Sequence, residues 1–476
     1  MHWGYTMSGM KMGNTRMKLL AGAVLFCVGG LVATSAMSTT LSGGGATLPA
    51  GGYVGFNFLS VPGIARLSKG PVTTPPSYGA AVSASSLFGA WATTTSNDIS
   101  YCQTGSGAGK RFLNGDSTGT LTATGSCGLI TGTPALVGFD ISAANSQNPD
   151  FIASDAPLSQ SEYTLFTTNK AAHVEPVQFP ALVGSIAIIY NIPGLASGVR
   201  LNLSESQVCQ VFSGKAATWG AVTPALTDTN GNTVVLPNPS LPIKIAFRSD
   251  GSGTSFNFSN HLAANCGTGD VIGGHFDTDQ TWSATAPATS VIKDLVGFPT
   301  GSALLPSNGN PAVVTSVANN AGAVGYTETA NFINAPSASV AAAKIGGKDP
   351  ATDLVTTFNA PAGSLVSDQA ITGVSATGTP TLAALTTVPG QASCVAIVNP
   401  NSYAKGVTAG AGYPIVAVTY LLANSRGNST NVTALRSFLL NPYGAHTGVT
   451  TVGAGTGFAF IGNAGVTNAR VNACVQ

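Results

Sequence analysis

A strand, a glycine-rich turn and a helix start follow one another between residues 243 and 262, and they constrain the fold more than any other feature. The apolar run 243–247 is typical of a buried strand, and Phe258 and Leu262 share one helical face. The turn between them begins at Arg248 and reads RSDGSGTS. A helix start exposes unpaired N–H groups at the positive end of the helix dipole. The segment therefore predicts either a site for a tetrahedral oxyanion or an ordinary strand–helix turn.

Strand and helix signals alternate along much of the chain. Residues 185–190, SIAIIY, are a candidate buried strand. Ser159 with Glu162, and Ser204 with Gln207, have the spacing of capping boxes at helix starts. Such alternation predicts an α/β protein with open, largely parallel sheets, in which ligands bind beside the carboxyl ends of strands.

The chain is long and weakly charged. Its 476 residues have room for two or three domains, and charged residues make up only 8% of them. Residues 1–40 hold three basic residues and no acidic one, so the remainder carries two more acidic than basic residues. Because no basic field exists for nucleic acid or anionic lipid, an anion site must work through local donors. The Ala/Thr/Ser/Gly/Pro-rich stretches near 267–310 and 333–393 are expected to form surface loops or small excursions.

The N-terminus has the pattern of a secretory signal peptide. Lys18 precedes a short apolar run at 19–33, and small residues follow it as far as Ala36. We expect a signal peptide at 1–36 and therefore a periplasmic or secreted protein. The alternative is a single N-terminal membrane anchor, for which the run is short and rich in glycine.

Six cysteines remain after cleavage, an even number that is typical of disulfides in an exported chain. Six cysteines allow 15 pairings. We favour pairing between neighbours in sequence, which closes the shortest loops and gives Cys102–Cys127, Cys209–Cys266 and Cys394–Cys474.

A metal site is not expected. The chain has no C-x-x-C pair, so a cysteine zinc site is disfavoured. His275 lies near Asp277 and Asp279 and could bind a metal with them, but a loop in solvent is the favoured interpretation.

Eight stretches, including the segment around Arg248, occur in an order that is known from one family. They are GGGATLP at 43–49, YCQTGSGAG at 101–109, ASDAPLS at 153–159, IYNIPGL at 189–195, LNLSESQVCQVFSGKAATWG at 201–220, FRSDGSGTSFNFSNHL at 247–262, AGAVGYTE at 321–328 and GYPIVAVTYLLAN at 412–424. With them the chain resembles the exported phosphate-binding proteins that serve ABC-type phosphate importers, and their relatives, the DING proteins. Several motifs in one order are far more specific than a single glycine turn.

The resemblance implies a two-lobed, type II periplasmic-binding-protein fold of the Venus-flytrap kind, with mixed open sheets and flanking helices. The first lobe would comprise residues 41–184 and 410–476, and the second lobe residues 185–409. Phosphate would lie buried in the cleft between the lobes.

The resemblance also implies which residues hold the phosphate. Arg248 would bind its oxygens in a bidentate fashion, and Asp250 would pair with Arg248 and hold its rotamer. The other residues would donate from hydroxyls, from loop backbone or from helix N-termini. The expected phosphate-binding residues are Thr47, Leu48, Ser106, Asp155, Arg248, Asp250, Ser252, Gly253 and Thr254.

Asp155 is the expected selector. A buried carboxylate beside an anion is costly unless it accepts a proton from that anion. Phosphate at neutral pH carries such a proton and sulfate carries none, so Asp155 would favour phosphate. The alternative is that Asp155 merely caps the helix near Pro157.

No catalytic set is visible in the sequence. Ser106 and Ser252 lack the G-x-S-x-G frame of a hydrolase, and the turn before Lys110 lacks the spacing of a nucleotide-binding loop. We therefore expect a monomeric binding protein without enzymatic activity or cofactor. Its ligand would be inorganic phosphate, with an ABC phosphate permease as a candidate partner and no nucleic acid. Two alternatives stay open: a secreted DING-like protein with phosphatase activity, and a surface adhesin built on the same scaffold.

Overall fold

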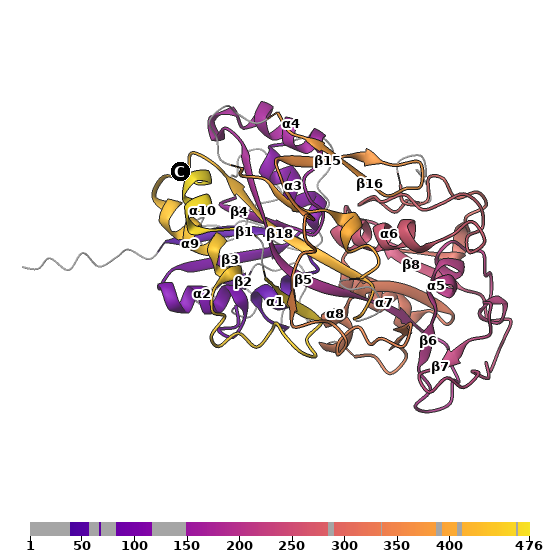
Figure 1. Cartoon of the computed structure of the whole chain (residues 1–476). Helices are drawn as coiled ribbons and strands as arrows, with labels where there is room; N and C mark the ends of the chain where they lie inside the picture. Colours follow the sequence, from indigo (N-terminus) through magenta and orange to yellow (C-terminus); the bar gives the residue numbers. More distant parts are fainter. Residues whose placement is uncertain are drawn as a thin grey trace, which may run out of the picture. The chain divides into compact units, whose positions relative to one another are not determined.

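The computed structural model describes most of the chain after residue 38 (Figure 1). The described residues are 39–56, 66–67, 82–116, 149–283, 290–334, 336–386, 393–406, 412–462 and 465–476. The predicted signal peptide at 1–36 lies outside them. Within the described residues, no helix combines the length and the apolar character that a membrane crossing requires.

A 15-residue strand, β5 (Pro176–Tyr190), links the two parts of the main sheet. All of its residues are buried, so the strand is covered on both faces of the sheet. Its first ten residues pair antiparallel with β18 (Val416–Asn424), and its last five pair antiparallel with β10 (Ala323–Glu328). The main path of the sheet runs through β2 (Arg66–Leu67), β3 (Asp98–Gln103), β1 (Thr40–Gly45), β4 (Phe151–Ser154), β18, β5, β10, β8 (Lys244–Arg248) and β9 (Leu304–Ser307). β5 thus changes its partner after Ser185.

On one side of β5 lie β1 (Thr40–Gly45), β3 (Asp98–Gln103) and β4 (Phe151–Ser154). β1 pairs in parallel with both neighbours, and β2 (Arg66–Leu67) closes this edge against β3. The helices of this side are α1 (Ala50–Val54), α2 (Leu87–Thr95), α3 (Ser106–Asn114), α4 (Gln160–Asn169), α9 (Val432–Leu440) and α10 (Asn468–Cys474). The aromatic rings of Phe88, Tyr101, Phe151 and Phe438 pack together in the core.

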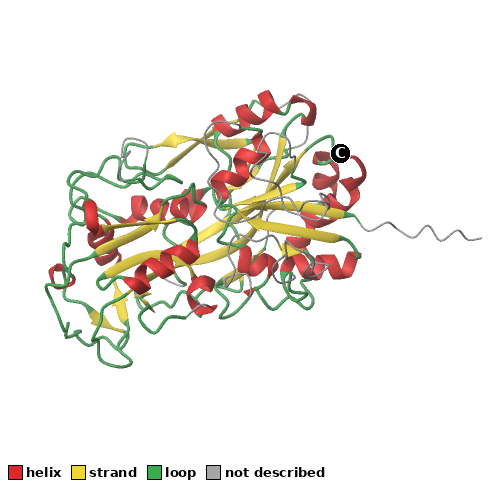
Figure 2. Ribbon diagram, turned by 180° about the vertical axis from the view of Figure 1, so that it is seen from behind, coloured by secondary structure: helices red, strands yellow, loops and turns green. Residues whose placement is uncertain are grey.

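On the other side of β5, β8 (Lys244–Arg248) pairs in parallel with β10 and with β9 (Leu304–Ser307). The helices here are α5 (Glu205–Phe212), α6 (Gly253–Asn265), α7 (Asn310–Asn319) and α8 (Thr329–Asn334). Figure 2 shows helices on both faces of the strands, the arrangement that buries parallel strands. The predicted strand–turn–helix is β8 followed by α6, and both predicted capping boxes are confirmed at the starts of α4 and α5.

The stretch 333–393 is more structured than the expected loops. It holds β13 (Thr357–Phe358), which pairs with β19 (Phe458–Ile461), and a hairpin of β15 (Gln369–Val374) and β16 (Pro380–Ala384). Further short strands are β6 (Leu201–Leu203), β7 (Thr227–Asp228), β11 (Ala341–Ala342), β12 (Lys344–Ile345), β14 (Leu365–Ser367) and β17 (Ala396–Val398). The segment contacts elements of both predicted lobes, and the lobe bounds stay a prediction.

Two of the three predicted disulfides are confirmed. Cys209–Cys266 joins α5 to the end of α6, and Cys394–Cys474 joins the segment before β17 to α10. Cys102 is disulfide-bonded, and its predicted partner Cys127 lies outside the described residues.

Candidate functional site

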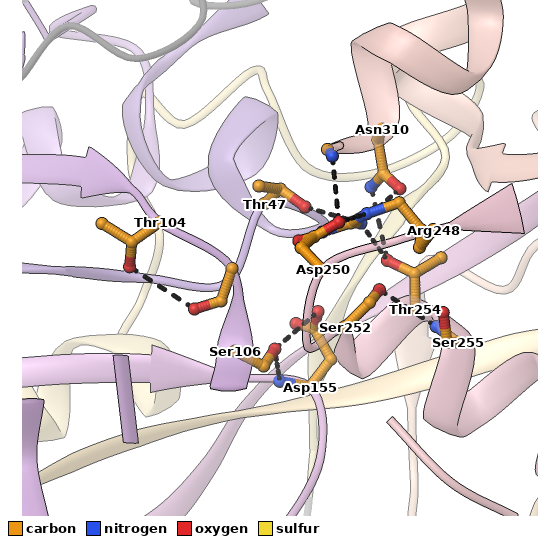
Figure 3. A network of polar contacts seen from close by, with 12 residues as sticks. Thr47, Thr104, Ser106, Asp155, Arg248, Asp250, Ser252, Thr254, Ser255 and Asn310 are labelled. Carbon is orange, nitrogen blue, oxygen red and sulfur yellow. Dashed lines mark hydrogen bonds and ion pairs between the residues drawn. The ribbon is translucent and has the colours of Figure 1, made fainter. Parts of the chain in front are cut away.

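Polar side chains gather where parallel strands end. Thr47 follows β1, Ser106 follows β3 and Asp155 follows β4, whereas Arg248 is the last residue of β8 and Asn310 follows β9. Each is buried, with at most 6% of its surface exposed. The first three come from one side of β5 and the other two from the opposite side, and Figure 3 shows them close to one another. The sequence prediction of a ligand site beside carboxyl ends is consistent with this placement.

Four helices begin next to these residues in the sequence. α1, α3, α6 and α7 start after the strands that carry these polar residues. Each helix start presents unpaired N–H groups and a positive partial charge. Several such starts around one point favour an anion there without any net positive charge on the protein.

Glycines allow the two sides of the site to approach closely. The N–H of Gly107 donates to the carbonyl of Gly251 at 2.9 Å, which joins α3 to the turn before α6. Gly105 has a φ of +86°, and a Cβ there would lie 2.8 Å from Oδ2 of Asp250. A Cβ on Gly253 would lie 2.5 Å from both the Asp155 Cβ and the Ser106 Oγ. The glycine pattern of the sequence therefore reflects backbone contact across the site.

Arg248 is the centre of the first cluster. Its Nε donates to Oδ1 of Asp250 at 2.6 Å, and its Nη2 donates to Oδ2 of the same carboxylate. Its Nη1 donates to Oγ1 of Thr47 at 3.0 Å, to Oδ1 of Asn310 at 2.7 Å and to Oγ1 of Thr254 at 3.4 Å. The predicted pairing of Arg248 with Asp250 is thus present, and it fixes the plane of the guanidinium.

The charges of this pair are mutually stabilised. Burial alone would raise the pKa of Asp250, but the charge and hydrogen bonds of Arg248 outweigh it and leave that pKa lowered. Burial opposes the charge of Arg248 in turn, and Asp250 offsets this effect so that the pKa of Arg248 is raised. Both groups therefore stay ionised at neutral pH.

Asp155 and Ser106 form the second cluster. The Ser106 Oγ donates to Oδ2 of Asp155 at 3.3 Å and accepts from its backbone N–H at 3.1 Å. The backbone carbonyl of Asp155 accepts from Nδ2 of Asn257 at 2.6 Å, which ties it to α6. The helix-cap alternative for Asp155 is wrong, because Ser159 caps α4 and Asp155 takes no part in that cap.

The Asp155 carboxyl is poised between two protonation states. Burial raises its pKa from 3.8 to about 7, while Arg248, Ser106 and Lys110 pull it down. Its Oδ1 is buried and accepts no hydrogen bond from any residue that the structure describes. A buried oxygen without a donor is costly, so this atom is suited to accept a proton from a ligand.

The remaining predicted residues take supporting places. The Oγ of Ser252 accepts from the N–H of Ser255 at 3.1 Å and so caps α6. Thr254 is fully buried, and its Oγ1 also accepts from Nδ2 of Asn310 at 3.3 Å. Leu48 is fully buried, and its side chain packs against Gly184.

Sequence reasoning missed Asn310 and Glu328. Nδ2 of Asn310 donates to Oε2 of Glu328 at 2.9 Å, which directs Oδ1 of Asn310 toward Arg248. Burial raises the pKa of Glu328 well above its usual range, although hydrogen bonds from Asn331 and Asn310 oppose the rise. A signal was available for Asn310, because residues 304–319 repeat the strand–glycine turn–helix form of the segment at 243–262.

Lys110 is a buried cation close to this site. Its Nζ is 2.8 Å from Oε1 of Glu162, in the first turn of α4, and 3.4 Å from the carbonyl of Pro157. The spacing of the turn before Lys110 excludes a nucleotide-binding lysine. The structure gives it a different place, where its charge favours the ionised form of Asp155.

The family comparison agrees with this architecture. The family model of the PBP superfamily domain matches residues 80–440 of the chain. The chain belongs to the PBP superfamily. Two solved structures share the fold. One is a high-affinity periplasmic phosphate-binding protein (PfluDING) bound with phosphate, with a TM-score of 0.52, 20% identity and coverage of 91% of this chain and 93% of that one.

The second structure is a phosphate-binding protein from Stenotrophomonas maltophilia, with a TM-score of 0.52, 21% identity and coverage of 92% of this chain and 94% of that one. The α/β, two-lobed binding-protein fold that the sequence predicts for this chain is therefore confirmed.

Curated relatives match over shorter stretches. Phosphate-binding protein PstS 3 of Mycobacterium leprae is 36% identical over 141 residues, which are 29% of this chain and 36% of the relative. Alkaline phosphatase L of Pseudomonas aeruginosa is 30% identical over 273 residues, which are 57% of this chain and 52% of the relative. The matches thus span between about a third and a half of the length of these relatives.

Proposed function

We propose that this PBP superfamily member is exported and captures inorganic phosphate, which it supplies to an ABC-type importer. The proposal rests mainly on the environment of the Asp155 carboxyl. Its buried Oδ1 accepts no hydrogen bond from the described residues, and the charge of Arg248 is close enough to lower the pKa of this carboxyl. Phosphate can donate a proton to Asp155 and accept from Arg248 and from the helix starts, and sulfate cannot do the first.

The functions for which similar proteins are named support the proposal. PstS 3 of Mycobacterium leprae is named a phosphate-binding protein, and the structure with the same fold was solved with phosphate bound. In the proposed site Arg248 would give up its bonds to Thr47 and Asn310 in exchange for phosphate oxygens, because one guanidinium cannot serve both. Asp250 would keep holding the far edge of that guanidinium.

Thermal unfolding of the mature, phosphate-stripped protein tests the proposal. A ligand that binds only the folded state stabilises it by about 2.7 kcal/mol at a hundredfold excess over its Kd. We expect phosphate to raise the unfolding temperature and sulfate to leave it unchanged. In the Asp155→Asn variant, whose amide can donate to either anion, the difference between phosphate and sulfate should shrink. No shift with either anion would favour the adhesin alternative, and an equal shift in the parent with both would refute the role of Asp155.

Phosphate-ester hydrolysis is the second candidate, since one relative is named alkaline phosphatase L. The Ser106 hydroxyl beside the Asp155 carboxyl is the nearest approach to a nucleophile and base within the site. A chromogenic phosphate ester separates the two functions. Turnover that disappears in Ser106→Ala would establish an enzyme, and phosphate binding without turnover would leave a binding protein.

A further inference from the structure

A histidine and two carboxylates meet in the loop that connects α6 to β9. Nε2 of His275 is 3.3 Å from Oδ1 of Asp277 and 3.3 Å from Oδ2 of Asp294. One candidate ligand atom from each residue lies within 4.8 Å of the other two. Imidazole nitrogen and carboxylate oxygen are both ligands of divalent transition ions.

The two distances fit a shared ion better than a hydrogen bond. Charge-assisted N–H···O bonds are about 2.7–2.9 Å long, so 3.3 Å is long for one. In a tetrahedral zinc site with ligands at about 2.0–2.1 Å, adjacent ligand atoms lie about 3.3–3.4 Å apart. The spacing around His275 therefore matches two edges of such a tetrahedron.

Asp277 supplies an independent reason to expect a cation. The residue is 4% exposed, and its buried Oδ1 accepts no hydrogen bond from the described part of the chain. This oxygen is the one that faces His275. The expectation of a solvated loop is thus wrong for Asp277. Asp279 stands apart from the cluster, since its Oδ1 accepts from the N–H of Thr281 at 2.7 Å.

Lys293 partly neutralises the two carboxylates. Its Nζ is 3.2 Å from Oδ2 of Asp277 and 3.6 Å from Oδ2 of Asp294. The side chain is 43% exposed, so it can turn toward solvent when a cation arrives. The lysine pairs with Oδ2 of Asp277, and Oδ1 accepts no hydrogen bond from it.

We propose that His275, Asp277 and Asp294 bind one divalent transition ion of the Zn²⁺ type. Three protein ligands leave a fourth tetrahedral position for water. The ion would join the two arms of the loop, which are already connected by the bond from the N–H of Asp277 to the carbonyl of Val291 at 2.9 Å.

The same loop is hydrogen-bonded to α6, whose N-terminus is part of the proposed anion site. The carbonyl of Gln280 accepts from the N–H of Ser252 at 2.9 Å, immediately before α6. The carbonyl of Asp279 accepts from Oγ of Ser259 at 3.3 Å, further along that helix. An ion at His275 therefore stabilises a loop that holds the N-terminal part of α6 in place.

Calorimetric titration with Zn²⁺ tests the proposal on the mature protein, after chelator treatment and in phosphate-free buffer. We expect one ion per chain, and a Co²⁺-loaded protein should show the strong visible absorption of tetrahedral coordination. His275→Gln and Asp294→Asn should each weaken Zn²⁺ binding by about tenfold or more. Lys293→Met should strengthen it, because a competing cation is removed. His446→Gln, which alters a histidine outside the cluster, should bind as the parent does.

Each result decides the proposal. Thermal unfolding without metal checks whether each variant is folded, and Lys293→Met keeps the proposal testable if a ligand variant fails to fold. Zn²⁺ binding that is unchanged in His275→Gln and Asp294→Asn would overturn it, as would weaker binding in Lys293→Met. The absence of binding by the parent at about a hundredfold molar excess of Zn²⁺ would overturn it as well.

Discussion

Replacing Asp155 by Asn should stabilise the ligand-free protein, and more so as the pH rises. The folded state raises the pKa of Asp155 from 3.8 to about 7 because the carboxyl is buried. The folded state therefore binds this proton more tightly than the unfolded state does. The stability that comes from the bound proton is fully present below pH 3.8 and is lost as the pH rises through about 7. Asn cannot ionise, so the variant escapes that loss.

The size of the effect follows from the same two values. At about 1.4 kcal/mol per pH unit between 3.8 and about 7, ionising Asp155 costs the ligand-free fold about 4 kcal/mol. Asp155 is 1% exposed, so solvent screening does little to reduce this figure. The free energy of unfolding of the variant minus that of the parent should thus increase by about 4 kcal/mol from pH 4 to pH 8.

Urea unfolding of both phosphate-stripped proteins at several pH values measures this difference. Taking the difference removes the contributions of other buried carboxyls, such as Glu328, that titrate alike in both proteins. Saturating phosphate should narrow the difference at pH 8, because the ionised carboxylate of the parent then accepts a proton from the ligand. A difference that is independent of pH would refute the account of Asp155 as a carboxyl strained by burial.

Three further changes test the site and the fold. Arg248→Ala should weaken phosphate binding and cost about 3–5 kcal/mol of stability, because it leaves a buried carboxylate unpaired; calorimetric binding and urea unfolding measure the two effects. Gly253→Ala should abolish binding, since its Cβ would lie 2.5 Å from atoms of two site residues, whereas Gly269→Ala, with nothing within 4 Å, should bind phosphate normally. The double change Cys209→Ser and Cys266→Ser should lower the free energy of unfolding by about 4 kcal/mol, because it opens a loop of 57 residues. Normal phosphate binding by Arg248→Ala or Gly253→Ala would contradict these expectations. An unchanged urea midpoint in the double cysteine variant would contradict them as well.

The strand–turn–helix segments could be predicted because their signals are local. Arg248 at the end of β8, the glycines of the turn and the start of α6 lie within a few residues of one another, so the sequence places Arg248 and Asp250 together. The same holds for the capping boxes, in which Ser159 meets Glu162 three residues on. Short-range geometry of this kind depends little on the remainder of the fold.

Contacts between distant residues could not be predicted in the same way. Asn310 reaches Arg248 across 62 residues of sequence, and only the parallel pairing of β8 with β9 brings them together. The sequence places Asp277 in the stretch near 267–310, for which surface loops are expected. The aromatic side chains of Phe276 and Trp282, which are buried, pull that loop into the core and bury the carboxylate with it.

A crystal structure of the phosphate-saturated protein tests the central claim most directly. The account predicts one phosphate in contact with the Arg248 guanidinium and the N-terminus of α6, with a phosphate oxygen within hydrogen-bond distance of Oδ1 of Asp155. A phosphate bound elsewhere, or an Asp155 carboxyl that makes no contact with the bound anion, would contradict it.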